Sequence, residues 1–221
     1  AYRTDQKYCF VKDGILNVAV YRDPHTTSDG KTQPYSSARI RTQRRGEWQY
    51  GRFEVRAKMP NGQGIWPAVW MLPTDSKYGG WAAGGEIDII ESRGSAVSET
   101  TGAIHFGGGW PRNTYLSHSY TFPAQDAAEA FHLYALEWNA DEIKWSVDGK
   151  LCKTRRKDEW FSERAKNNPN APFDQPFHLI VNVAVDGRFF ENTDQRADLL
   201  PPDAFPQLLK IDYIRVYQWA E

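Results

Sequence analysis

The sequence predicts an all-β sandwich, and three observations support this fold class. Segments in which apolar and polar residues alternate recur along the chain, and a period of two is typical of strands with one buried face. Turn signals such as KDG, PNGQG and VDGK separate these segments. Helical periodicity is confined to two short pieces, 126–131 and 202–207. About a dozen short strands with almost no helix indicate a β-sandwich.

The alternating segments predict strands over six ranges. In chain order these are 15–20 (ILNVAV), 37–43 (SARIRTQ), 52–58 (RFEVRAK), 132–138 (HLYALEW), 142–148 (EIKWSVD) and 210–217 (KIDYIRVY). Two polar segments, 22–34 and 162–172, are expected to be surface loops, since neither resembles a linker between domains. The length of 221 residues therefore predicts one domain over 1–221.

Charge and composition exclude several classes of partner. The chain carries 27 basic and 28 acidic residues with no long run of either sign, so we expect no nucleic acid and no acidic membrane surface as partner. No apolar run reaches membrane-spanning length. The aromatic content of 14% is expected mostly in the core, with a few rings left to stack on sugars. Cys9 and Cys152 could form one disulfide or none.

Three acids, Glu86, Asp88 and Glu91, lie within six positions of an isoleucine-rich segment, EIDIIE. On a regular strand Glu86 and Asp88 share one face, and Glu91 points to the other. A β-bulge between Asp88 and Glu91 adds one residue and brings all three to the same side. Two glutamates arranged in this way could approach the separation of roughly 5 to 5.5 Å that a retaining glycosidase uses.

Two other readings of the acids carry less weight. The acids of a surface strand usually face water, but the flanking WAAGG and the isoleucine face favour a strand with one buried side and one side open to a groove. A metal site of three carboxylates would need ligands that converge from loops.

In this context EIDIIE resembles the bulged E-x-D-x-x-E signature of glycoside hydrolase family 16. Further segments are similar to the laminarinase branch, the endo-1,3-β-glucanases, and together they cover nearly the whole chain; they are 50–94, 102–115, 131–150, 171–185 and 210–218. The resemblance implies a β-jelly-roll of two curved antiparallel sheets, with the substrate in a concave cleft. It also implies retaining hydrolysis of β-1,3-glucan, with Glu86 as nucleophile, Glu91 as general acid/base and Asp88 as the assisting carboxylate.

The resemblance also implies residues that line the cleft. Trp66, Trp70 and Trp81 match aromatic positions, and His105 matches a histidine near the acid/base. Two further positions, Arg39 and Asn182, match polar residues that hydrogen-bond sugar hydroxyls. No cofactor is implied for catalysis.

Some members of this family hold a structural calcium ion on the convex side. They use a backbone carbonyl in a turn and an aspartate on the final strand, and Gly14 and Asp212 match these two positions.

The chain departs from the family pattern in two places. Members usually begin with a further strand and a long segment before the region that matches YRTDQ, so we expect a catalytic domain without this N-terminal strand segment. After Asn182 the chain reads AVDGRFFENTD where laminarinases tend to read AVGGNWPG. Asp186, Arg188 and Phe189 are therefore expected to alter one end of the cleft.

The leading prediction is an extracellular, monomeric endo-1,3-β-glucanase whose signal peptide has been removed. A mixed-linkage 1,3-1,4-β-glucanase is the alternative within the same class. A non-catalytic β-glucan-binding module is the alternative from another class, although such relatives have typically lost the acids that this chain retains.

Overall fold

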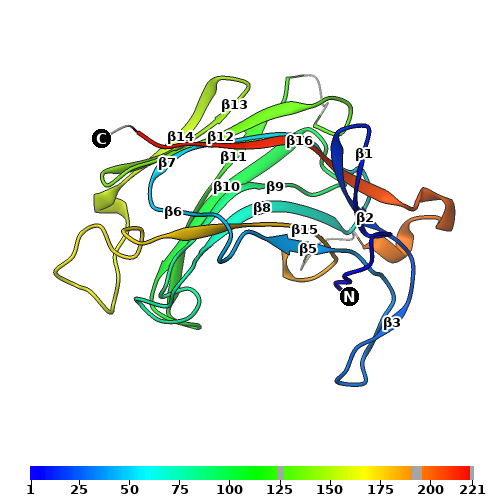
Figure 1. Ribbon diagram of the computed structural model, residues 1–221, viewed down its shortest axis with the longest axis horizontal. Helices are drawn as coiled ribbons and strands as arrows, with labels where there is room; N and C mark the ends of the chain where they lie inside the picture. Colours follow the sequence, from blue (N-terminus) through cyan, green and yellow to red (C-terminus); the bar gives the residue numbers. More distant parts are fainter. Residues whose placement is uncertain (124–126, 191–195, 220–221) are drawn as a thin grey trace.

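The computed structural model describes residues 1–123, 127–190 and 196–219, and two large antiparallel sheets stack face to face in it (Figure 1). The first sheet contains, in spatial order, β1 (Cys9–Lys12), β2 (Ile15–Val20), β16 (Gln207–Tyr217), β7 (Gly51–Lys58), β12 (His132–Trp138), β13 (Glu142–Val147) and β14 (Lys150–Arg156). The second contains β11 (Asn113–Thr121), β10 (Glu99–Gly107), β9 (Glu86–Glu91), β8 (Ile65–Pro73), β15 (Phe177–Val185) and β5 (Arg39–Arg41), with β6 (Glu47–Trp48) also paired to β15. The predicted jelly-roll sandwich is confirmed.

The predicted strands all occur, with ends that differ by a few residues at most. The loop predicted over 22–34 contains a small hairpin of β3 (His25–Thr26) and β4 (Thr32–Gln33). Within the described ranges, every helical element is a three-residue 3₁₀ turn: η1 (Lys157–Glu159), η2 (Arg188–Phe190), η3 (Ala197–Leu199) and η4 (Pro202–Ala204). Part of the piece at 126–131 lies outside the described residues, and the rest of it forms a turn and a bend.

The core lies between the two sheets and is rich in aromatic rings. Phe53 and Trp138 of the first sheet are fully buried there, and Phe177 of the second packs edge-on against Trp138 at 5.3 Å. On β8, Val69 and Met71 point into this core while Trp66 and Trp70 alternate to the outer face. The outer face of the second sheet therefore carries the side chains that can form a cleft.

Strand β9 lies inside the second sheet, between β8 and β10. On β8, Val69 pairs with Ile90 whereas the next residue, Trp70, pairs with Asp88. Ile89 is thus the extra residue of a β-bulge, and both Ile89 and Ile90 are buried in the core. The bulge predicted between Asp88 and Glu91 is confirmed.

The two cysteines lie on β1 and β14, which are the opposite edge strands of the first sheet. Both are free thiols, so they form no disulfide with each other. Among the described residues, no helix has the length and apolar character that crossing a membrane requires.

Candidate active site

The bulge brings the three acids to one pocket on the outer face of the second sheet. This pocket of about 150 Å³ is lined by Glu86, Asp88 and Glu91 of β9 together with side chains of β5, β8 and β15. Asp88 is almost fully buried, and the two glutamates flank it at the ends of the strand. The acids are therefore held by paired backbone rather than by loops.

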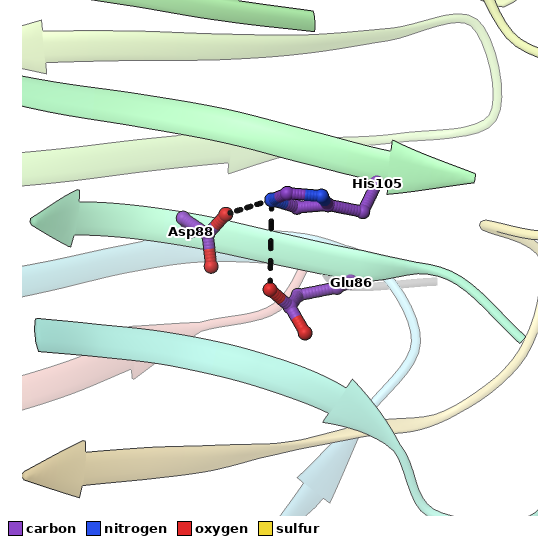
Figure 2. A group of neighbouring side chains, drawn as sticks. All are labelled: Glu86, Asp88 and His105. Carbon is purple, nitrogen blue, oxygen red and sulfur yellow. Dashed lines mark ion pairs between the residues drawn. The ribbon is translucent and has the colours of Figure 1, made fainter. Parts of the chain in front are cut away.

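His105 of β10 pairs with Glu86 in the strand register, and its ring points toward Glu86 and Asp88 (Figure 2). Its Nε2 atom lies 3.2 Å from Asp88 Oδ2 and 3.6 Å from Glu86 Oε1. The ring stacks on Tyr115 with centroids 5.6 Å apart. His105 thus lies within reach of both Glu86 and Asp88.

Each glutamate accepts a hydrogen bond from one tryptophan. Trp81 donates its indole N–H to Glu86 at 2.7 Å, and Trp66 donates to Glu91 at 2.9 Å. Trp66 is part of β8, whereas Trp81 precedes β9 and is 45% exposed, so its ring face remains accessible to a ligand.

Burial raises the pKa of all three carboxyl groups, because a low-dielectric surrounding disfavours the charged form. The pKa of Glu86 is raised well above its usual value by burial and by the charge of Asp88, while His105 and the Trp81 N–H act in the opposite direction. The pKa of Asp88 is also raised well above its usual value, by burial and by the charge of Glu91.

Burial raises the pKa of Glu91 as well, and three neighbours oppose this effect. They are the Trp66 N–H, His105 and Arg93. A carboxyl group that keeps its proton toward neutral pH is what a general acid requires.

One end of the pocket is polar and aromatic. Trp70 donates its indole N–H to the side-chain oxygen of Asn182 at 2.8 Å. The guanidinium of Arg39 lies 5.3 Å from the Trp70 ring and 4.5 Å from the Tyr2 ring. All of the predicted cleft residues thus lie on the outer face around the acids, and their contacts with sugar stay a prediction.

Two aromatic residues at the site were not singled out as cleft residues from the sequence. Tyr115 contacts His105 because β10 and β11 pair these two positions. Phe189, predicted only to alter the end of the cleft, stacks on Trp66 at 4.8 Å with an interplanar angle of 18°. The hairpin turn at 107–113 could have located Tyr115, since it sets the register of β11.

The two predicted calcium ligands lie on the other sheet, away from the acids. Gly14 is in the turn between β1 and β2, and the carboxylate of Asp212 on β16 forms an ion pair with Arg56. One paired carboxylate and one carbonyl fall short of the six to eight oxygens that calcium takes. The calcium site stays a prediction, and the chemistry proposed below does not involve it.

Comparison with known proteins gives a family match over almost the whole chain. The model of the family described as "Glycosyl hydrolases family 16" matches residues 5–215. A solved structure, the laminarinase catalytic domain from Thermotoga maritima, superimposes with a TM-score of 0.82 at 36% identity, covering 98% of this chain and 82% of that one.

Two curated relatives are similar in sequence. "Glucan endo-1,3-beta-glucosidase A1" of Niallia circulans is 43% identical over 98% of this chain, which spans 32% of the relative. "Beta-1,3-glucan-binding protein" of Penaeus monodon is 41% identical over 73% of this chain, which spans 49% of that relative. The chain therefore spans at most about half of the length of either protein.

Proposed function

Because the chain belongs to glycosyl hydrolases family 16, we propose that it cleaves β-1,3-glucosidic bonds within laminarin-type β-glucans and retains the anomeric configuration. One observation carries this proposal. The bulge at Ile89 places Glu86, Asp88 and Glu91 in a single pocket, where each glutamate is hydrogen-bonded by a tryptophan.

In the proposed reaction, protonated Glu91 gives its proton to the departing glycosidic oxygen while ionised Glu86 attacks the anomeric carbon. The bond from that carbon to the leaving oxygen breaks as the glycosyl ester on Glu86 forms. Water then attacks the same carbon, Glu91 takes up its proton, and Glu86 leaves as a carboxylate.

Burial raises the pKa of both glutamates, so the two roles are assigned from the family resemblance and are tuned by the neighbours of each carboxylate. Glu86 has to be ionised to attack, and both the Trp81 N–H and a charged His105 favour its ionised form. Glu91 has to start protonated, and burial favours its neutral form. Asp88 holds His105 at 3.2 Å and couples electrostatically to Glu91, which is the assisting role that the sequence predicts.

We assign glucan binding to the side chains around this pocket. Trp81 offers an exposed ring beside Glu86, and sugar rings stack on such apolar faces. Arg39 and Asn182 supply polar groups on the β5 and β15 side. A long polymer of this kind is met outside the cell, so we propose an extracellular enzyme.

The alternative of a binding module has one observation in its favour, the relative from Penaeus monodon that is named a β-1,3-glucan-binding protein. The mixed-linkage activity also stays open as an alternative. Purified protein incubated with laminarin, lichenan, agarose and carrageenan, with products separated by chromatography, distinguishes the three. Cleavage of laminarin alone supports the proposal, and binding of laminarin without cleavage contradicts it.

Replacement of the nucleophile tests the assignment directly. Glu86→Gln removes the attacking carboxylate but keeps a similar shape, so kcat should fall below detection while laminarin affinity changes little. The anomeric configuration of the first product, read by NMR on the wild-type protein, is the independent measurement. Substantial activity in Glu86→Gln, or an inverted first product, would contradict the mechanism.

A further inference from the structure

Two side chains from opposite ends of the second sheet meet near the cleft. The guanidinium of Arg188, in η2, lies 4.9 Å from the ring centroid of Trp110. Arg188 follows β15. Asn182 of β15 and Glu91 of β9 both pair with Ala68 of β8, so the end of β15 at Val185 lies at the same end of the sheet as Glu91. Trp110 follows β10, which ends at Gly107 on the Glu86 side. The contact therefore joins the two ends of the sheet.

The segment that carries Arg188 is anchored beside Glu91. Phe189 stacks on Trp66, which donates a hydrogen bond to Glu91. The guanidinium of Arg93, which follows β9, lies 4.4 Å from the Phe189 ring centroid. Arg188 thus extends from a packed aromatic cluster next to the acid/base.

The segment that carries Trp110 passes close to Trp81, beside Glu86. A Cβ atom at Gly109 would lie 4.0 Å from the carbonyl oxygen of Trp81, the residue that donates a hydrogen bond to Glu86. Trp110 itself is 61% exposed, and the Arg188 guanidinium lies over its ring. The Arg188–Trp110 contact thus links a segment packed beside Glu91 to a segment that passes Trp81 beside Glu86.

We propose that Arg188 and Trp110 form a bridge over the cleft that selects unbranched glucan chains. A glucosyl branch beside the cleaved bond would have to displace the Arg188–Trp110 contact, whereas an unbranched chain carries no such substituent. This inference rests on the proposed function for its substrate class. It assigns branch specificity to two residues that neither donate protons nor attack the sugar.

The bridge is a cation–π contact between exposed groups, so it is weak enough to open. A contact of this kind changes an equilibrium by about two- to fivefold. A polymer can therefore still enter sideways, as internal cleavage requires, while branched chains bind less well. Removing either partner should relax the preference by a similar factor.

The test measures affinity rather than turnover, in the Glu86→Gln background. Calorimetry gives the Kd for a linear β-1,3-glucan oligosaccharide and for one with single β-1,6-linked glucosyl branches. The ratio of the two affinities should favour the linear ligand, and Trp110→Ala or Arg188→Ala should each reduce this ratio about two- to fivefold. Arg188→Lys keeps a cation and should retain most of the preference.

Arg112→Ala is the matched control, because Arg112 lies in the same loop as Trp110 and pairs with Glu163 instead. It should leave the ratio unchanged. An unchanged ratio in Trp110→Ala and Arg188→Ala would overturn the bridge, as would a ratio that shifts equally in Arg112→Ala. Loss of hydrolysis in the wild-type protein with the binding preference intact would overturn the proposed function alone.

Discussion

Trp66 and Trp81 act on the acids in the same way but on different partners. Each donates an indole N–H to one carboxylate oxygen, to Glu91 and Glu86 respectively. Such a bond stabilises the ionised form of the carboxylate and opposes the effect of burial on its pKa. The two tryptophans therefore provide a way to shift the two titrations separately.

We predict that Trp66→Phe and Trp81→Phe move opposite limbs of the pH–rate profile. Loss of the N–H in Trp66→Phe raises the pKa of Glu91, which has to be protonated, so the alkaline limb of kcat/KM moves to higher pH by about one unit. Trp81→Phe raises the pKa of Glu86, which has to be ionised, so the acidic limb moves to higher pH. Movement of the same limb in both variants would contradict the assigned roles.

Asp88 is a buried carboxyl group whose presence should cost stability. Its pKa is raised in the folded protein by burial and by the charge of Glu91. The folded state therefore holds this proton at pH values where the unfolded chain has released it. Linkage then requires that stability falls as pH rises from the unfolded pKa of Asp88 through its higher folded pKa.

We predict that Asp88→Asn raises the free energy of unfolding at pH 7 by about 1–3 kcal/mol while it lowers kcat. The gain should shrink toward zero below about pH 3, where the aspartate is mostly protonated in both states. Urea unfolding of both proteins at several pH values measures the difference. A variant that is less stable than the wild type at neutral pH would show that Asp88 contributes favourably to folding.

At the scale of the element, the bulge on β9 sets which face each acid occupies. Ile89 has no partner of its own on β8, because Val69 and Trp70 pair with Ile90 and Asp88. Deletion of Ile89 would therefore shorten the segment between Asp88 and Glu91 by one residue without changing the pairs on either side of it.

We predict that deletion of Ile89 leaves all three acids on the outer face and retains part of the activity. The deletion should cost about 2–5 kcal/mol of stability, because it removes a buried isoleucine side chain. Insertion of one alanine between Ile90 and Glu91 should instead turn Glu91 toward the core and lower kcat by about 10²–10⁴-fold. Steady-state kinetics and urea unfolding compare the two, and equal activity in both would contradict the role of the bulge.

At the scale of the whole molecule, aromatic packing joins the two sheets. Phe177 lies in the second sheet with no exposed surface, and it contacts Trp138 of the first sheet and Phe173 of the preceding loop. Removing this ring would leave a cavity at the centre of the sandwich.

We predict that Phe177→Ala lowers the free energy of unfolding by about 3–5 kcal/mol. The folded fraction should keep its kcat, because Phe177 points away from the cleft. Chemical denaturation together with activity normalised to the folded fraction measures both effects. A stability loss below about 1 kcal/mol would show that the core closes around the missing ring.

Alternation of apolar and polar residues predicted the strands of the first sheet best. Those at 15–20 and 132–138 occur with the same bounds. Strand β15 has no such pattern, because most of its residues are buried on both faces, between the core and the cleft. Such strands read as continuous apolar runs, so periodicity alone does not identify them.

The spacing of the acids predicted the bulge, but it did not distinguish the two glutamates. Their roles came from the family resemblance, and their tryptophan partners became visible only in the structure. The contact of Arg188 with Trp110 joins positions 188 and 110 through two loops. Local sequence patterns carry no information on such a pair, because the distance depends on the pairing of the whole sheet.

The two glutamates share one short strand that is paired on both sides, whereas the aromatic bridge is built from segments beyond the strand ends. The proposed reaction chemistry and the proposed substrate choice therefore depend on separate parts of the chain. A change of length in these loop segments should leave Glu86 and Glu91 in the positions relative to each other that β9 gives them. Engineering new glucan preferences should accordingly begin with the residues at 108–112 and 186–190 and leave β9 untouched.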